Sequence, residues 1–444
     1  MPDTFDTILK NGTVVNQDGT AQRDIGIRDG RIAGIGSFYP EQAGETVDCT
    51  GLHVLPGVID SQVHFREPGI EHKEDLETGS HAAVMGGVTT VFEMPNTKPL
   101  TTTEAALADK VSRAHHRMHC DFAFWVGGTR ENVRDIPELE RLPAAAGIKV
   151  FMGSSTGDLL VEDDQGVRDI LSATNRRAAF HSEDEYRLKD RAGERIENDP
   201  RSHPIWRDEI AALQCTQRLV RIARETGAKI HILHLSTAEE VDFLIPHKDV
   251  ASIEVTPHHL TLTDEAYERL GTLVQMNPPV RAERHKDRLW WGLGQSVLDI
   301  LGSDHAPHLL EEKQKPYPAS PSGMTGVQTL VPIMLDHVNA GRLTLDRFVD
   351  MTSAGPLRLF QIARKGRIAV GYDADFTIVD LKKTRTITND WIASKCGWTP
   401  YDGKSVTGWP IGTVIRGRKV MWEDQLVGAS TGEAVLFQES RIRS

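Results

Sequence analysis

The sequence predicts an α/β fold, a (β/α)₈ barrel of the TIM type with a small β-sandwich domain formed by the N- and C-terminal segments. Eight short apolar segments have the length of β-strands, amphipathic stretches lie between most of them, and short β-like pieces occupy both ends of the chain. Polar residues capable of chemistry lie at the ends of six of the eight strands. Only a closed barrel gathers so many strand ends at one mouth, so the barrel is favoured over a doubly wound sheet.

The predicted strands and helices alternate through the middle of the chain. The strands cover residues 52–60, 88–94, 121–126, 147–152, 177–181, 229–235, 251–255 and 297–303. Amphipathic patterns between them predict helices at 103–117, 205–226 and 282–293. This alternation is typical of β/α units that build a parallel sheet.

Both ends of the chain have the pattern of an all-β unit. Pieces at 13–15, 24–27 and 31–35 are punctuated by Asn-Gly and Asp-Gly turns, and similar pieces occur at 371–380 and 412–418. We therefore expect residues 1–52 and 366–444 to form one discontinuous β-sandwich domain around a barrel of residues 53–365. The proline-rich stretch 313–321 is expected to be an exposed, mobile loop.

The composition excludes several classes of function. The net charge is −12 and the basic residues are scattered, whereas a nucleic-acid surface needs a concentrated basic patch. The four cysteines, at positions 49, 120, 215 and 396, are far apart and fit reduced thiols. No apolar run approaches the ~20 residues of a membrane span, and the N-terminus lacks an apolar leader. A soluble, cytoplasmic protein is expected.

Five residues with metal-binding chemistry lie on predicted barrel strands or at their ends. In chain order they are His64, Lys149, His181, His234 and Asp304. Imidazole and carboxylate are the usual zinc ligands of hydrolytic sites, where the ion makes a water acidic enough to attack a carbonyl near neutral pH. An ammonium group would repel a cation, so Lys149 fits such a site only if it is neutral or converted by CO₂ to a carbamate. Each residue alone could be structural, but five at matching strand positions favour a metal site.

With these residues the chain resembles the dihydroorotases of the amidohydrolase superfamily, over nearly its whole length. The resemblance implies that the five residues bind one or two Zn²⁺ ions and that Lys149 is the carboxylated lysine that bridges them. It also implies that Asp304 carries the proton from the attacking hydroxide to the leaving amide nitrogen, first as general base and then as general acid.

The substrate-binding residues of that family have counterparts here as well. The resemblance assigns the substrate carboxylate to Arg66, Asn96 and His308, because a guanidinium suits a planar carboxylate and an amide and an imidazole add directional donors. Hydantoinases and allantoinases open similar rings that lack this carboxylate and generally lack this arginine. The structural alternative for Arg66 is a salt bridge with Glu67 or Glu71.

Two further motifs give weaker support to the resemblance. Asn277, in Met-Asn-Pro-Pro-Val-Arg, matches the family's loop after strand seven, where an asparagine faces the pyrimidine ring; the alternative is a rigid Pro-Pro turn. His258 and His259 also recur in the family. We expect them to pack around the site and not to bind the metal.

Position 62 departs from the family pattern. Gln62 lies two residues before His64, where the family has the first histidine of a His-x-His pair that aims two imidazoles at one ion. An amide oxygen is a poorer zinc ligand than imidazole. Three outcomes stay open: a mononuclear or unequally occupied site, a ligating Gln62 with reduced activity, or a degenerate enzyme retained for assembly.

The sequence therefore predicts a metal-dependent hydrolase of cyclic amides. The main hypothesis is the reversible conversion of L-dihydroorotate to N-carbamoyl-L-aspartate in de novo pyrimidine biosynthesis. The alternatives are another cyclic amidohydrolase, of hydantoinase or allantoinase type, and a weak or inactive structural partner of a carbamoyltransferase. The resemblance implies a homodimer or homotetramer that acts on a small molecule, with no nucleic-acid or membrane partner.

Overall fold

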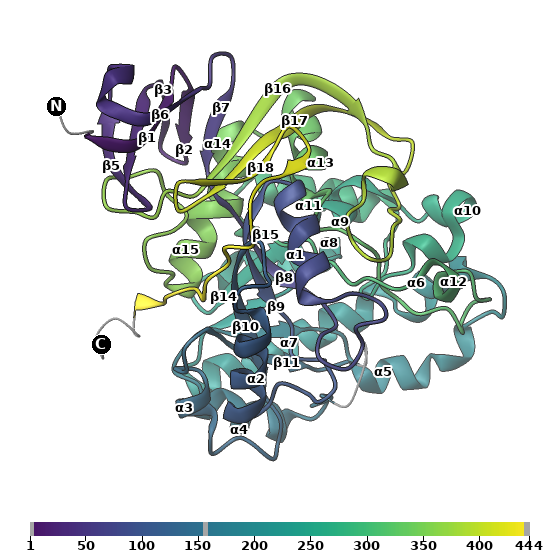
Figure 1. Cartoon of the computed structure of the whole chain (residues 1–444). Helices are drawn as coiled ribbons and strands as arrows, with labels where there is room; N and C mark the ends of the chain where they lie inside the picture. Colours follow the sequence, from purple (N-terminus) through teal and green to yellow (C-terminus); the bar gives the residue numbers. More distant parts are fainter. Residues whose placement is uncertain (1–3, 154–158, 439–444) are drawn as a thin grey trace.

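The computed structural model describes residues 4–153 and 159–438. Its centre is an eight-stranded sheet in the order β15-β14-β13-β12-β11-β10-β9-β8, and every neighbouring pair is parallel. A parallel bridge between Val63 and His305 closes the sheet, and the His64 backbone N–H donates to the His305 carbonyl at 2.7 Å. The predicted (β/α)₈ barrel is confirmed (Figure 1).

The barrel strands are short and buried on both faces, as parallel strands beneath a ring of helices are. They are β8 (Val58–Val63), β9 (Val88–Glu93), β10 (Asp121–Gly127), β11 (Ala145–Phe151), β12 (Ala178–His181), β13 (Ile230–Ile232), β14 (Ala251–Val255) and β15 (Ile300–Leu301). The expected strand at 52–60 is wrong as one element, because β7 (His53–Pro56) joins another sheet and β8 begins after Gly57. A Cβ atom at Gly57 would lie 2.3 Å from Thr89 Oγ1, so glycine lets the chain pass close to β9 there.

Helices surround the barrel, and side-chain caps fix where several of them begin. Thr103 and Asp208 accept hydrogen bonds from the first turns of α2 and α7. The long helices are α1 (Leu76–Met85), α2 (Glu104–Ala114), α4 (Asp164–Ala173), α7 (Glu209–Thr226), α8 (Ala238–Leu244), α11 (Glu283–Gly294) and α13 (Leu330–Asn339). The short ones are α3 (Ile136–Leu139), α5 (Glu185–Asp190), α6 (His203–Trp206), α9 (Pro257–Thr261), α10 (Ala266–Leu270), α12 (Leu310–Lys313), α14 (Leu345–Val349) and α15 (Gly355–Phe360). The helix expected at 205–226 is thus divided between α6 and α7.

Two further sheets lie beside the barrel (Figure 1). One has the order β5-β4-β1-β6 and the other β19-β18-β17-β16-β7-β2-β3. Their strands are β1 (Phe5–Lys10), β2 (Thr13–Asn16), β3 (Gly19–Gln22), β4 (Asp24–Arg28), β5 (Arg31–Gly36), β6 (Ala43–Asp48), β16 (Phe376–Thr386), β17 (Ser405–Ile415), β18 (Arg418–Trp422) and β19 (Gln425–Leu426). The antiparallel pairing of β16 with β7 joins the two ends of the chain in one sheet. The division into 1–52 with 366–444 and 53–365 stays a prediction, and residues 1–3 and 439–444 lie outside the described residues.

The stretch 313–321 is largely exposed, as its composition predicts, with residues 314–316, 318 and 319 at the surface. Lys313, Tyr317 and Ser320 are its buried side chains. Lys313 Nζ donates to the carbonyl oxygens of Pro321 at 2.8 Å and Gln275 at 3.2 Å, which fixes this stretch on the segment that carries Asn277. Composition alone did not predict the burial of Lys313, whose amine is satisfied by these carbonyl groups.

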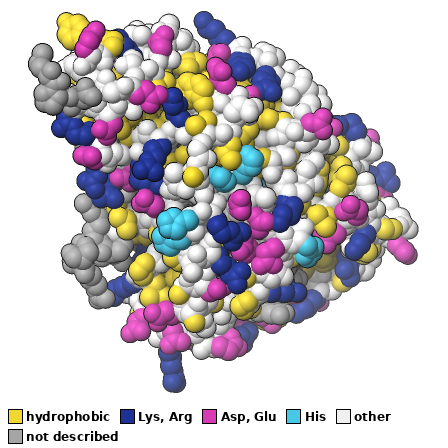
Figure 2. Space-filling view, viewed as in Figure 1, with side chains coloured by type: hydrophobic (Ala, Val, Ile, Leu, Met, Phe, Trp, Pro, Cys, Tyr) yellow, Lys and Arg dark blue, Asp and Glu magenta, His cyan; other side chains and the backbone are white. Residues whose placement is uncertain are grey.

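One face of the molecule shows how its charged side chains are distributed. On the face drawn in Figure 2, Lys and Arg side chains alternate with Asp and Glu and form no concentrated basic region. Among the described residues, no helix has both the length and the apolar composition needed to cross a bilayer.

Candidate active site

The carboxyl ends of the barrel strands surround one buried cavity. It is lined by Gln62, His64, Arg66, Lys149, Phe151, His181, His234, Met276, Asn277, Asp304, Ala306, Ser322 and Gly323. All five expected metal-binding residues lie in this lining, together with Gln62 and two of the four expected substrate-binding residues. The other two, Asn96 and His308, line an adjoining cavity of about 540 Å³ that shares Arg66 with the first.

His181 and His234 face each other across the first cavity. His181 Nδ1 lies 3.0 Å from His234 Nε2, and His181 Nε2 donates to Glu183 Oε2 at 2.8 Å. Burial opposes the charge of Glu183, but Arg207 and His181 outweigh burial and hold the pKa of this carboxyl well below its usual range. Such a carboxylate fixes the tautomer of a metal-binding histidine and leaves the opposite nitrogen as the donor to the ion. Sequence reasoning missed Glu183, although its position two residues after His181 was a usable signal.

Lys149 lies in the wall of the same cavity and is 1 % exposed. Its Nζ atom has no hydrogen-bond partner among the described residues and lies 4.4 Å from the centroid of the Phe151 ring. Burial lowers the pKa of Lys149 to about 7, so a large fraction of the amine is neutral near neutral pH. A neutral, unpartnered amine is the form that can react with CO₂.

His64, Asp304 and Gln62 form the opposite side of the cavity. His64 Nδ1 donates to Asn96 Oδ1 at 2.8 Å, and burial lowers the pKa of His64, so its Nε2 lone pair faces Asp304 Oδ1 at 3.3 Å. Gln62 Nε2 donates to the same Asp304 oxygen at 2.9 Å, and Gln62 Oε1 is buried with no hydrogen-bond partner among the residues that the structure describes. Two acceptors that face each other at this distance are a suitable pair for a cation.

The donor set fits a metal ion only with the help of Lys149 or Gln62. Among the residues that the structure describes, no three His, Cys, Asp or Glu side chains are arranged to hold an ion by themselves. His181 and His234 supply two nitrogens, and Lys149 is the third group beside them. His64 and Asp304 supply two groups on the other side, with Gln62 as the third.

Three of the expected site residues have left-handed backbone conformations. The φ angles are 64° at Arg66, 38° at His234 and 49° at Asp304. For residues with a Cβ atom, this conformation costs roughly 1–2 kcal/mol. Other contacts must hold these backbones in place, and such strain is common where side chains are aimed at a functional site.

Arg66 faces the adjoining cavity and not the neighbouring glutamates. Its Nε donates to the Pro307 carbonyl at 3.1 Å, and Nη2 lies 3.3 Å from His308 Nε2. Glu67 instead accepts from Arg117 at 2.8 Å, and Glu71 accepts from the Gly69 backbone at 2.8 Å. The salt-bridge alternative for Arg66 is therefore wrong.

Asn277 is held in one orientation by a residue that the sequence did not indicate. His203 Nε2 lies 2.8 Å from the Met276 carbonyl, which can only accept, so this nitrogen carries a proton and also donates to Asn277 Oδ1 at 3.0 Å. Burial lowers the pKa of His203 to about 3 and keeps the ring neutral. Asn277 lines the cavity, and its carboxamide nitrogen is not used by this contact. No sequence spacing signals a partner 74 positions away.

His258 and His259 do not line the cavity. His259 Nε2 lies 3.2 Å from the carbonyls of Pro278 and Pro279, and its Nδ1 lies 2.7 Å from Thr256 Oγ1. His259 thus packs against the loop that carries Asn277, which is the packing role expected for it.

Comparison with known proteins identifies relatives of the whole chain. A family profile described as the amidohydrolase family matches residues 53–420. The chain is 37% identical over 433 residues to a dihydroorotase of Methanothermobacter thermautotrophicus, covering 95% of this chain and 96% of the relative. It is 35% identical over 455 residues to a dihydroorotase of Methanosarcina mazei, covering 99% and 98%. A solved L-hydantoinase from Arthrobacter aurescens superimposes with a TM-score of 0.92 at 31% identity, covering 97% of this chain and 99% of that chain.

Proposed function

Because the chain belongs to the amidohydrolase family, we propose that it is a dihydroorotase, which opens L-dihydroorotate to N-carbamoyl-L-aspartate and catalyses the reverse ring closure. One observation carries the proposal beyond a general hydrolase of cyclic amides. Arg66 lines both the cavity that holds the metal-type residues and the adjoining cavity, and it lies beside His308. A ring whose amide lies in the first cavity can therefore present a carboxylate to this guanidinium.

We propose zinc as the cofactor, held by His181, His234 and a carboxylated Lys149. A second ion between His64 and Asp304 would bind weakly, because Gln62 would have to give up its hydrogen bond to Asp304 to offer its oxygen. When bound, zinc supplies a Lewis acid for the ring carbonyl and lowers the pKa of water.

The residues of the chain then divide the remaining tasks of the reaction. Arg66, His308 and Asn96 hold the substrate carboxylate, and the Asn277 carboxamide faces the ring. Asp304 accepts a proton from the attacking water and returns it to the ring nitrogen when the C–N bond breaks. Gln62 donates to one oxygen of Asp304 and so leaves the other oxygen for this transfer.

A second candidate is hydrolysis of a hydantoin, and the likeness to the solved L-hydantoinase favours it. Hydantoin itself has no carboxylate, so it would leave the Arg66 guanidinium facing an unfilled cavity. A structural partner of a carbamoyltransferase is the third possibility, but such a role has no physical need of Arg66, Asn96 and His308 together. We further propose a soluble cytoplasmic protein that forms a homodimer or homotetramer.

A comparison of the turnover of three cyclic substrates tests the proposal directly. Purified protein is loaded with zinc in bicarbonate, and its turnover of dihydroorotate, dihydrouracil and hydantoin is compared. Dihydroorotate should have the highest kcat/KM. A higher kcat/KM for a ring without a carboxylate would establish the hydantoinase-type alternative, and no turnover with any ring at full metal loading would favour the structural role.

A further inference from the structure

Lys73 lies beside the proposed carboxylate-binding residues and contacts one of them. Its Nζ atom lies 3.0 Å from His308 Nδ1 and 3.0 Å from Glu312 Oε1. Lys73 also lines the cavity of about 540 Å³ together with Arg66, Asn96 and His308. The side chain is 15% exposed, so the ammonium group stands at the edge of this cavity.

The contact with Lys73 determines which nitrogen of His308 carries a proton. An ammonium group can only donate, so His308 Nδ1 accepts from it. Burial, with Arg66 and Lys73 beside the ring, lowers the pKa of His308 well below its usual value, so the single proton is on Nε2. Nε2 lies 3.1 Å from the Ser322 carbonyl and 3.3 Å from Arg66 Nη2. The N–H group of His308 therefore donates to the Ser322 carbonyl, and the Arg66 guanidinium lies beside it.

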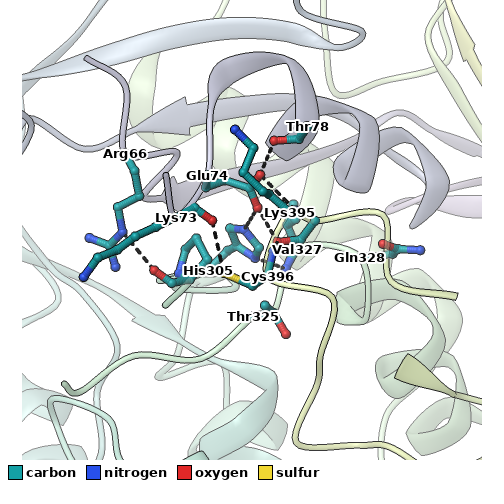
Figure 3. A network of polar contacts seen from close by, with 12 residues as sticks. Arg66, Lys73, Glu74, Thr78, His305, Thr325, Val327, Gln328, Lys395 and Cys396 are labelled. Carbon is teal, nitrogen blue, oxygen red and sulfur yellow. Dashed lines mark hydrogen bonds and ion pairs between the residues drawn. The ribbon is translucent and has the colours of Figure 1, made fainter. Parts of the chain in front are cut away.

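The segment between β16 and β17 forms hydrogen bonds with the backbones of both Lys73 and His308. Cys396 Sγ donates to the Lys73 carbonyl at 3.1 Å, and Trp398 Nε1 donates to the His308 carbonyl at 2.8 Å. In Figure 3, Lys73 and Cys396 lie together, next to Glu74 and His305. The backbones of Lys73 and His308 are thus fixed by the fold, and the ammonium group is held by its contacts with His308 and Glu312.

The charges around this cavity favour an anion. Arg66 and Lys73 bring two positive charges, and Glu312 offsets one of them. Lys98 lines the same cavity but is exposed, and its backbone N–H donates to the Pro68 carbonyl. Lys98 therefore offers a lysine of equal charge in the same cavity, without the contact to His308.

We propose that Lys73 is a specificity-determining positioning residue of the carboxylate site. It holds His308 in one tautomer and orientation beside Arg66 and adds a positive charge there, and the site thereby selects carboxylated rings over uncharged ones. This inference rests on the proposed function for the identity of the ring, but its test uses binding as well as turnover.

The experiment compares Lys73→Met with Lys73→Arg and with the matched control Lys98→Met, all loaded with zinc. Calorimetry measures the Kd of orotate, a carboxylated pyrimidine, and of uracil, the same ring without the carboxylate. We expect Lys73→Met to weaken orotate binding about tenfold and to leave uracil binding unchanged. The KM for dihydroorotate should rise by about the same factor with kcat within about threefold, as expected for lost uniform binding. Lys73→Arg should recover most of the affinity, and Lys98→Met should match the wild type.

Three outcomes would overturn the inference: unchanged orotate affinity in Lys73→Met, an equal loss in Lys98→Met, or equal impairment of Lys73→Arg and Lys73→Met. The proposed function fails separately. Wild-type protein that binds orotate through Lys73 but does not hydrolyse dihydroorotate would refute the function and keep the inference. If the wild type hydrolyses dihydroorotate but Lys73→Met binds orotate as tightly as the wild type, the proposed function stands and the inference about Lys73 is refuted.

Discussion

The side-chain amide of Gln62 donates a hydrogen bond of 2.9 Å to the carboxylate of Asp304. A histidine at position 62 would offer a ring nitrogen with a lone pair for a cation, whereas the glutamine offers an N–H group to the proposed proton carrier. The carbonyl end of the amide, Oε1, is buried and has no hydrogen-bond partner within the described ranges 4–153 and 159–438. Gln62 thus holds the carboxylate of Asp304, and on the proposed function it weakens the second of the two proposed ion sites, the one between His64 and Asp304.

Replacing Gln62 by histidine should strengthen metal binding at the proposed second site, between His64 and Asp304. We expect the zinc content of Gln62→His to rise from about one ion per chain toward about two, because imidazole is the better zinc ligand, with a higher kcat for dihydroorotate. Metal analysis by mass spectrometry after dialysis measures the stoichiometry. Gln62→Ala is the control, since it removes the amide without adding a ligand and should stay near one ion. Wild-type protein that already holds two tightly bound ions would contradict this account.

Arg66 should discriminate between substrates by their carboxylate. Arg66→Met removes a charged fork, so kcat/KM for dihydroorotate should fall at least ~100-fold, whereas that for dihydrouracil should change little. Arg66→Lys keeps the positive charge but lacks the two-pronged guanidinium, so its kcat/KM for dihydroorotate should lie between those of the wild type and Arg66→Met. Equal losses on both substrates would show that Arg66 supports the fold or the metal site and does not read the carboxylate.

Glu183 should act on metal affinity through His181. Glu183→Gln removes the acceptor charge behind the His181 ring, and loss of such an outer partner typically weakens metal binding about 10- to 100-fold. Competition with a zinc chelator gives the Kd, and the exposed residue Glu197 provides the control Glu197→Gln. A Glu183→Gln protein that retains zinc as tightly as the wild type would show that His181 needs no such partner.

Asp121 should stabilise the junction between barrel and β-sheets without affecting the site. Its buried carboxylate accepts from Lys365 Nζ at 2.5 Å, from Arg416, and from the Glu433 backbone at 2.8 Å. Asp121→Asn removes one buried acidic partner of both cations, although Lys365 keeps Asp375 and Arg416 keeps Glu433, and should lower the free energy of unfolding by about 1–3 kcal/mol. The exposed pair of Asp109 and Arg113 is the control, and Asp109→Asn should cost under ~1 kcal/mol.

The stabilisation that Asp121 contributes should decrease as the pH falls. Burial would raise the pKa of Asp121, but Lys365 and Arg416 outweigh burial and lower it. The stabilisation by a group with a depressed pKa is complete above its ordinary pKa of about 4 and is lost as the pH falls through the lower folded-state value. Urea titrations should therefore show the difference between wild type and Asp121→Asn shrinking below about pH 4. A difference that grows on acidification would contradict the assignment.

Simple periodicity predicted the barrel and the residues at the ends of its strands, whereas the substrate-binding residues were assigned through the resemblance to the dihydroorotases. The strand expected at 251–255 is β14, and residues placed at the ends of parallel strands meet in one cavity. Partners set by the tertiary fold were not predictable in this way. The contact of His203 with Asn277 joins segments 74 positions apart, and the contact of Lys73 with His308 joins segments 235 apart. Burial of Lys313 was not predictable either, because its amine bonds to the carbonyl groups of Gln275 and Pro321, which only the tertiary fold brings to it.

The central claim is that this chain opens a carboxylated cyclic amide with a metal site that includes Lys149. The most direct measurement is steady-state hydrolysis of dihydroorotate by zinc-loaded wild type and Lys149→Met, with zinc content determined on the same samples. The account predicts turnover and bound zinc in the wild type and the loss of both in Lys149→Met. Wild-type protein that binds zinc through these residues but leaves dihydroorotate intact, or a Lys149→Met protein with undiminished turnover, would contradict it.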